Sequence, residues 1–263
     1  MRTIIAPPLP GSIVAPQLPR GIIAPRMPTT TTGDGITVPG SVLHMDGADA
    51  STTFTDQSGK TWTANGSAQI DTAQSKFGGA SGLFPGADGD YISSPAHADW
   101  WLDDGLDASL WTLAFWLRFS SVGDPVGFVQ QVQDNQNNWT LFQFAGALHF
   151  RVRVASVNTV DISQLWTPST STWYHVAVVK NGAAGYMHFI DGTQIGSTTP
   201  SSANIPDFAS QIQVGRMTRT TGAFGPLTGW MDELAIEKGI ARWTSNFTPP
   251  TSAHSTGSVV LTL

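Results

Sequence analysis

The sequence contains no cysteine and few charged side chains. None of its 263 residues is Cys, which excludes a disulfide framework, a thiol nucleophile and a zinc site with Cys ligands. Charged residues make up 12% of the chain, which argues against a coiled coil or a charge-rich disordered protein. No run of apolar residues reaches the length of about eighteen that indicates a transmembrane helix, so we expect no membrane partner.

Positive charge is also scarce outside the N-terminal region. The formal net charge is −6, but Arg2, Arg20 and Arg26 against Asp34 give residues 1–40 a charge of +2, which leaves −8 on the remainder. Phosphate contacts need clustered Lys or Arg, so an acidic body argues against nucleic acid as the partner. The opposite signs indicate that the N-terminal region and the body meet different surfaces.

Residues 1–28 form a proline-rich repeat. The segments IIAPPLP (4–10), IVAPQLP (13–19) and IIAPRMP (22–28) recur with a period of nine. Proline excludes a helix and favours polyproline II, whose three residues per turn return equivalent side chains to one face. We therefore expect an extended arm that docks on a partner, or alternatively a stiff spacer. The docking side chains would be Ile4, Ile5, Leu9, Ile13, Val14, Leu18, Ile22, Ile23 and Met27.

The arm also bears on where the protein is made. Prolines at positions 7, 8 and 10 interrupt the apolar region that a secretion signal needs, so we expect synthesis in a cytoplasm. Residues 29–40 are expected to be a linker, because TTTTGDG is a flexible sequence.

From residue 41 onward, short alternating runs predict strands. In 111–119 and 148–154 apolar and polar positions alternate, with His149, Arg151 and Arg153 facing outward. The run 173–180 is apolar at consecutive positions, which predicts a central strand covered on both faces. Many short strands with regular turns predict an all-β, antiparallel jelly-roll sandwich over residues 41–250. A tail with a short strand follows at 251–263.

Residues 42–93 and several later motifs resemble the concanavalin A-like, laminin G-like jelly-roll family. The later motifs occur in the family's order and are WTLAFWLRF (111–119), WYHVAVVKNG (173–182), FIDGTQIG (189–196), IQVGR (212–216) and GWMDELAIEKGIARWTSNFTPP (229–250). The resemblance implies a binding or structural module, of the kind found in bacteriophage virion proteins and bacterial surface proteins.

Some relatives of this fold are glucanases with the pattern E-x-D-x-x-E on one strand. Here Glu233 and Glu237 are the only glutamates and do not fit that pattern. Four residues apart on a strand they would lie ~13 Å apart, too far for a retaining pair. We therefore expect no enzyme, and a solvated face for both glutamates. Alternation assigns the opposite, core face to Trp230, Asp232, Leu234 and Ile236.

The resemblance also suggests where a metal or glycan would bind. It implies that Asp46 and Asp232 lie close together, because the terminal strands are commonly neighbours in such jelly rolls. Asp46, Asp56 and Asp232 are therefore candidate calcium ligands, although hydrogen-bonded structural aspartates are the favoured alternative. A glycan platform would use Trp100, Trp101 and Trp139, whereas burial in the core is the alternative for these rings.

Together these features predict a non-enzymatic phage virion protein. It would be a capsid decoration or head-fibre protein, made in the host cytoplasm, with residues 1–28 anchored on a major capsid or other virion protein. The body would bind surface glycans, and a homo-oligomer is expected. The alternative is a carbohydrate-binding receptor or adhesion module of a tail or cell surface.

Overall fold

The computed structural model describes residues 40–103, 109–218 and 225–254. The proline-rich arm, residues 29–39 of the predicted linker and residues 255–263 of the predicted tail lie outside them. Within the described residues, no helix is long and apolar enough to cross a membrane.

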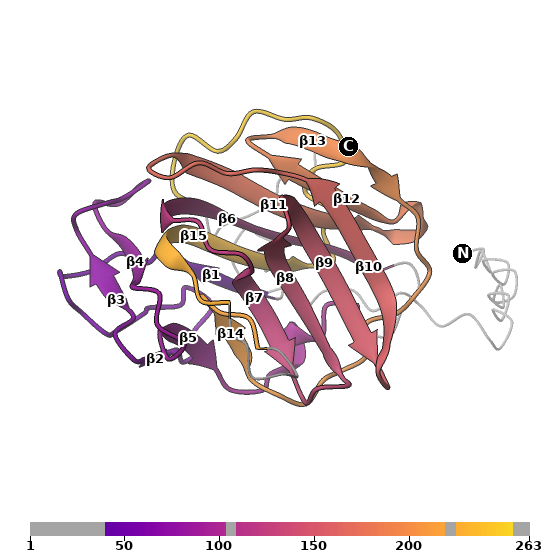
Figure 1. Cartoon of the computed structure of the whole chain (residues 1–263), viewed down its shortest axis with the longest axis horizontal. Helices are drawn as coiled ribbons and strands as arrows, with labels where there is room; N and C mark the ends of the chain where they lie inside the picture. Colours follow the sequence, from indigo (N-terminus) through magenta and orange to yellow (C-terminus); the bar gives the residue numbers. More distant parts are fainter. Residues whose placement is uncertain (1–39, 104–108, 219–224, 255–263) are drawn as a thin grey trace, which may run out of the picture.

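Two antiparallel sheets pack face to face (Figure 1). The strands of the eight-stranded sheet are β1 (Gly40–Leu43), β3 (Gln69–Asp71), β4 (Ser81–Phe84), β6 (Leu110–Ser121), β11 (Trp173–Asn181), β12 (Tyr186–Ile190), β13 (Thr193–Thr199) and β15 (Thr228–Lys238). Those of the seven-stranded sheet are β2 (Thr63–Asn65), β5 (Tyr91–Ser94), β7 (Val126–Val132), β8 (Asn138–Phe144), β9 (Ala147–Val154), β10 (Val157–Leu165) and β14 (Ile212–Val214). Two short 3-10 helices are η1 (Ala98–Trp100) and η2 (Gly182–Ala184).

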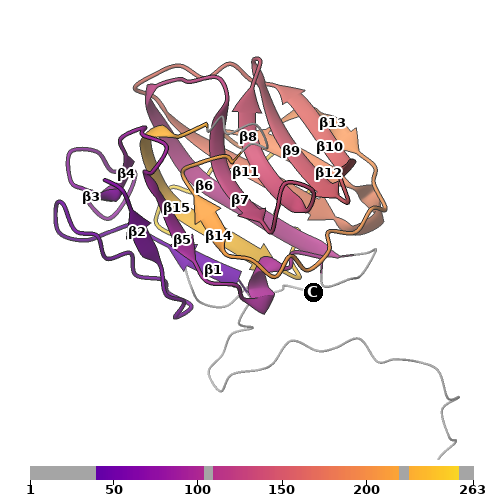
Figure 2. The same ribbon diagram turned by 60° about the horizontal axis from the view of Figure 1, so that its bottom comes forward.

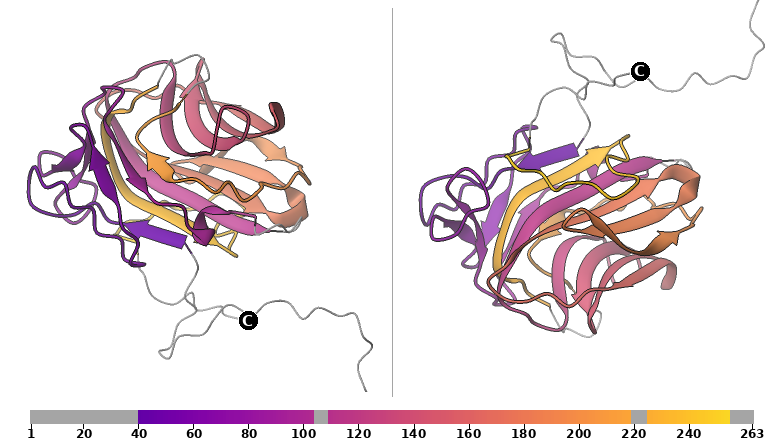
Figure 3. Two further views of the ribbon diagram at one scale, coloured as in Figure 1. Left: turned by 90° about the horizontal axis from the view of Figure 1, so that it is seen from below. Right: turned by 90° about the horizontal axis from the view of Figure 1, so that it is seen from above.

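The strand order is that of a jelly-roll sandwich. The eight-stranded sheet runs β13-β12-β11-β6-β15-β4-β3, with β1 paired to β15, and the seven-stranded sheet runs β10-β9-β8-β7-β14-β5-β2. Figure 2 shows β2 to β5 at one end of the sandwich and β10, β12 and β13 at the other. Figure 3 shows β1 alongside β15. The predicted all-β antiparallel fold is confirmed.

The predicted alternation is confirmed in the strands that build the core. β6 and β9 match the runs predicted at 111–119 and 148–154, and their inward side chains belong to one cluster between the sheets. β11 is covered on both faces, as expected, since its residues 176–179 are fully buried. The hairpin between β12 and β13 turns at Asp191 and Gly192, whose φ angles of 49° and 74° are those of a type I′ turn.

A second hydrophobic cluster lies on the outer face of the eight-stranded sheet. Its buried members come from β6, β11 and β12, and the C-terminal segment (residues 239–254) packs against them through Trp243 and Phe247. The two rings stack with centroids 4.1 Å apart, and Phe247 N–H donates to the Gly192 carbonyl at 2.8 Å. The C-terminal segment therefore covers the apolar patch on this face of the sandwich.

A bulge in β15 changes which side chains reach the core. The register with β6 shifts between Asp232 and Ala235, and Glu233 adopts a φ of 53°. Asp232 pairs with Trp116 on the outer face, whereas Met231 and Leu234 both point into the core. The prediction that Asp232 shares a face with Leu234 was wrong, because a bulge residue breaks the period of two.

The role of the C-terminal segment can be measured through Trp243. We expect Trp243→Ala to lower the free energy of unfolding by about 2–3 kcal/mol, because it uncovers apolar side chains of β11 and β12. Leu165→Ala is the matched control: Leu165 is 86% exposed, and its truncation should stay within about 0.5 kcal/mol of the wild type. Equal values for the two variants in urea unfolding would show that the segment does not stabilise the sheet.

Candidate functional site

The register of the seven-stranded sheet places one polar residue from every strand in a single row across its outer face. Successive cross-strand partners from β10 to β2 are Asp161, Arg151, Thr140, Gln130, Gln213, Ser93 and Thr63. Directly paired residues on neighbouring strands share a face. The row therefore forms a continuous band of hydrogen-bonding side chains opposite the core, of which Thr140, Gln130, Gln213 and Ser93 are buried.

The segment Arg216–Thr218 covers the middle of this row. The fully buried Gln130 holds it: Nε2 donates to Thr218 Oγ1 at 3.0 Å and to Gln213 Oε1 at 2.7 Å, while Oε1 accepts from Thr218 N–H at 3.0 Å. Gly127 permits the close approach, because a Cβ there would lie 2.3 Å from the backbone of Arg216 and Met217. The segment thereby makes a wall on an otherwise open sheet.

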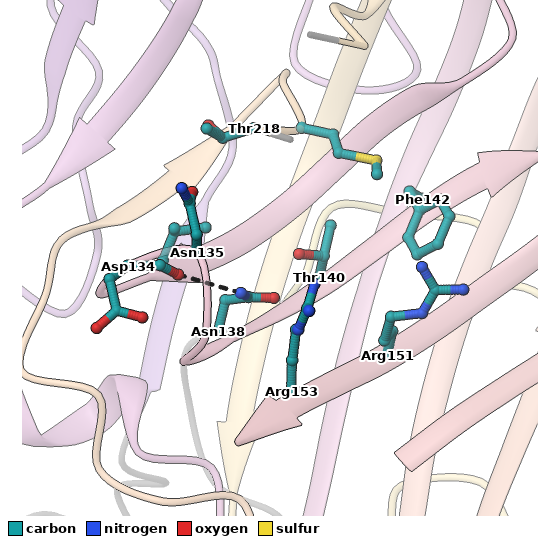
Figure 4. Close-up of a pocket in the computed structure, with 10 residues that line it drawn as sticks. Asp134, Asn135, Asn138, Thr140, Phe142, Arg151, Arg153 and Thr218 are labelled. Atoms are coloured by element: carbon teal, nitrogen blue, oxygen red, sulfur yellow. Dashed lines mark hydrogen bonds between the residues drawn. The ribbon is translucent and has the colours of Figure 1, made fainter. Parts of the chain in front are cut away.

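A groove of about 300 Å³ lies between this wall and β9 (Figure 4). Strand β8 contributes Asn138, Thr140 and Phe142 to its lining, and β9 contributes Arg151 and Arg153. Met217 and Thr218 line the opposite side, and Asp134 and Asn135 close one end. The volume is at the lower end of the roughly 300–1,000 Å³ typical of small-molecule sites.

The strand pairing fixes how these side chains face one another. Asn138 lies opposite Arg153, and Thr140 lies opposite Arg151. The Arg151 guanidinium carbon lies 5.1 Å from the centre of the Phe142 ring, and its Nε is 3.1 Å from Asp161 Oδ1. The groove thus combines a positioned cation, an aromatic ring and neutral hydrogen-bonding groups.

His149 supports the aromatic side of the groove without adding charge at neutral pH. Its ring stacks on Phe142 with centroids 4.8 Å apart and planes inclined by 11°. Burial lowers the pKa of His149 below its ordinary value of 6.5, and the charge of Arg151 lowers it further. Arg151 and Arg153 are therefore the cationic groups that line the groove.

The tryptophans predicted to form a glycan platform do not assemble one. Trp100 and Trp139 are fully buried, and their Nε1 groups donate to the Pro95 carbonyl at 2.8 Å and to Gln131 Oε1 at 3.1 Å. The prediction was wrong for these two, because the core uses their rings as packing groups. Trp101 is partly exposed, with its Nε1 bonded to the Ile205 carbonyl, and its proposed role stays a prediction.

Sequence reasoning missed most of the groove. The outward positions of Arg151 and Arg153 were predicted from alternation and are confirmed by their place in the lining. Thr140 and Asn138 lie on the neighbouring strand at positions that only the register reveals. The wall formed by Met217 and Thr218 has no sequence signal, since it depends on a long-range contact with Gln130.

Two of the three candidate metal ligands lie near each other. Asp232 Oδ2 accepts from the N–H groups of Lys76 and Phe77 at 2.8 and 3.1 Å, while Asp46 packs against Gly78 in the same turn. Burial raises the pKa of Asp46, and it raises that of Asp232 to about 8, with the charges of Glu233 and Asp46 adding to the effect. Two carboxyl groups in one buried place therefore oppose each other's ionisation.

Asp56, the third candidate, lies apart from these two and is a hydrogen-bonded structural residue. It accepts bonds from Ser41 Oγ, from Ser58 N–H and, at 2.9 Å, from Trp62 Nε1. Among the residues that the structure describes, no group of three or more His, Asp or Glu side chains is placed to hold a metal ion. Calcium at Asp46 and Asp232 stays a prediction.

Glu233 and Glu237 are buried beneath the C-terminal segment. Glu233 lies 3.0 Å from His44 Nδ1 and accepts from His254 N–H, whereas Glu237 forms an ion pair with Arg242. Their exposed fractions are 5% and 4%, so the prediction of a solvated face was wrong. It failed because Arg242 and His254, which follow β15 in the chain, fold back over that strand.

Comparison with known proteins agrees with this architecture. The family model described as the concanavalin A-like lectin/glucanases superfamily matches residues 85–241. The chain belongs to this superfamily. No curated protein sequence matches the chain. The predicted resemblance to concanavalin A-like, laminin G-like jelly rolls is thereby confirmed.

Several solved structures that resemble this superfamily member are binding domains. The binding domain of Paraclostridial Mosquitocidal Protein 1 is 18% identical, with a TM-score of 0.58 over 76% of this chain and 48% of that one. The binding domain of botulinum neurotoxin DC, in complex with rat synaptotagmin II, is 14% identical, with a TM-score of 0.56 over 84% and 49%. The chain thus spans about half the length of these toxin chains.

A third similar structure is matched over nearly its whole length. Domain 4 of AbnA, a GH43 extracellular arabinanase from Geobacillus stearothermophilus, was solved in complex with arabinotriose. It is 16% identical, with a TM-score of 0.53 over 77% of this chain and 94% of that one. At this identity the similarity shows the shared fold.

The carboxyl pair gives a prediction about pH. Because the pKa of Asp232 is raised from 3.8 to about 8, the folded state keeps a proton that the unfolded chain has lost between these values. The free energy of unfolding therefore falls as pH rises from about 4 to 8 and levels off above. Asp46→Asn removes one opposing charge, so we expect a shallower fall and a gain of ~1 kcal/mol at pH 8.

The measurement is urea unfolding at pH 4.5 and 8.0 with EDTA present. Asp49→Asn, which removes an exposed acidic group on the same loop, controls for the change in net charge. An unchanged slope in Asp46→Asn would contradict the coupling. Thermal unfolding with calcium in place of EDTA tests for a calcium site. Bound calcium would raise the melting temperature of the wild type more than that of Asp46→Asn.

Proposed function

We propose that this protein is a non-enzymatic binding module that holds a glycan in the groove beside β8 and β9. The observation that carries the proposal is the groove itself, which brings hydrogen-bonding groups of β8 and β9 together over a buried aromatic ring on the outer face of the sheet. Specific ligand sites generally combine such an apolar surface with a few placed polar groups.

The chemistry of the lining suits a sugar. A sugar offers hydroxyl groups that donate and accept, and it also has apolar C–H faces. Asn138 and Thr140 can both donate and accept, and the buried Phe142 ring supports the Arg151 guanidinium from below. The Asn138 amide is held by a bond from Nδ2 to the Asp134 carbonyl at 3.2 Å, drawn in Figure 4. Its position is therefore set before a ligand arrives, which lowers the entropic cost of binding.

Two further observations support binding without catalysis. Glu233 and Glu237, the only glutamates that could serve a glucanase, lie under the C-terminal segment on β15 of the eight-stranded sheet. The groove lies on the other sheet. The similar structures are binding domains, and one of them was solved with arabinotriose. Both observations favour a lectin-like role for the body.

The glycan proposal is tested with an oligosaccharide array, including arabinotriose, followed by calorimetry on the best ligand. We expect Thr140→Val, which keeps the shape and removes one hydroxyl, to weaken binding by about two- to tenfold. Ser163→Ala removes a hydroxyl from β10, outside the groove lining, and should bind like the wild type. Failure of the wild type to bind any glycan, or equal affinity of the two variants, would count against the groove.

The arm carries a second proposal, because its three repeats are a specific feature of this sequence. Residues 1–28 attach the body to a multimeric partner, and the protein is a capsid decoration or head-fibre protein of a phage virion that assembles as a homo-oligomer. Paired aliphatic residues recur in each repeat, and burial of one such side chain contributes roughly 1.5–3 kcal/mol. A receptor or adhesion module of a tail or cell surface is the alternative, with the same glycan groove.

The arm proposal predicts a graded loss of attachment. Replacing Ile4, Ile5, Ile13, Val14, Ile22 and Ile23 with Ser should leave the body folded and abolish co-sedimentation with the assembled particle. Replacing only Ile4 and Ile5 should weaken attachment in part, because two docking units remain. If the six-residue variant co-sediments like the wild type, the arm is a spacer.

A further inference from the structure

The two arginines of the groove differ in how their charges are matched. Arg151 has an acidic partner, Asp161, and lies over Phe142. Arg153 is half-buried, and its Nε, like that of Arg151, is buried without a hydrogen-bond partner. Within the part of the chain that the structure describes, Arg153 forms no ion pair or hydrogen bond, so its positive charge is uncompensated.

The acidic residue at the end of the groove does not supply the missing partner. Asp134 uses its carboxylate within its own turn, where it accepts from the N–H groups of Gln136 and Asn137 at 2.7 and 2.8 Å and from Asn137 Nδ2 at 3.1 Å. The cross-strand neighbours of Arg153 are Asn138 and Asn158, both neutral. On the neighbouring strands Arg153 is therefore flanked by neutral side chains, and the carboxylate of Asp134 is engaged in its own turn.

Such an arrangement is costly unless a ligand completes it. A guanidinium group is always charged and presents a planar set of donors that matches a carboxylate or a sulfate. An N–H group that is removed from water and left without an acceptor destabilises the free protein, and an anionic ligand group would satisfy it. The net charge of −6 makes this concentration of positive charge unusual for the chain.

We infer that the groove selects glycans bearing an acidic group, with Arg153 binding the carboxylate or sulfate and Thr140 and Asn138 contacting the sugar. The inference rests on the proposed glycan binding and adds the class of sugar. Carboxylate and sulfate share the chemistry that a guanidinium recognises, so the ligand can be a sialic acid, a uronic acid or a sulfated sugar. Arg151, which already pairs with Asp161, lines the groove but does not bind the acidic group.

The test uses an array of matched neutral and acidic glycans. It includes lactose, 3′-sialyllactose and 3′-sulfolactose, together with oligogalacturonate and its methyl ester. We expect the wild type to bind acidic members about ten- to a hundredfold more tightly than their neutral counterparts, with a preference that declines as salt rises. Comparison of 3′-sialyllactose with 3′-sulfolactose shows whether the groove prefers a carboxylate or a sulfate.

Two substitutions of Arg153 separate charge from geometry. Arg153→Gln should bind acidic and neutral members equally, whereas Arg153→Lys should keep part of the preference. Arg118→Gln removes one positive charge from β6, in the other sheet, and should retain the full preference. Near-UV circular dichroism checks that each variant keeps the wild-type fold.

The outcomes distinguish this inference from the proposed function. Binding of neutral and acidic members with equal affinity by the wild type would overturn the acidic preference and leave glycan binding intact. A preference that survives Arg153→Gln would overturn the role of Arg153. Absence of binding to every member would overturn the inference and the glycan proposal together.

Discussion

The covering of one sheet face by the C-terminal segment decides where this sandwich can bind a partner. A two-layer sandwich has two outer faces, and here Trp243 and Phe247 pack over apolar side chains on one of them. The same segment places His254 and Arg242 against the two glutamates of β15. One face is thereby used for stability, and the face of the seven-stranded sheet stays available for function.

On the outer face of the seven-stranded sheet, the register between β8 and β9 brings outward-facing side chains of the two strands together in one site. Arg151 and Arg153 alternate with core residues in β9, and β8 brings Thr140 and Asn138 directly opposite them. Gln130 then ties Thr218 to the sheet and adds a wall. The groove therefore depends on long-range pairing and on one buried amide.

The sequence was informative where period and composition determine structure. Alternation predicted the strands at 111–119 and 148–154, because a half-buried strand must alternate. It failed at Asp232 and Glu233, since a bulge is a local backbone feature that alternation does not encode. It failed again at Trp100 and Trp139, because neither burial nor exposure of a large ring can be read from neighbouring residues. Glu233 and Glu237 were misplaced because the segment that covers them comes later in the chain.

The most direct measurement is an NMR titration of the isotopically labelled full-length protein with the tightest-binding oligosaccharide from the array. We expect the largest amide shift changes in residues 138–144 and 147–154 and in Met217 and Thr218, the strands and wall of the groove. Amides of Trp243 and Phe247 on the covered face should stay unchanged. Shift changes confined to the covered face, or to the ends of the sandwich away from the groove, would contradict the binding site.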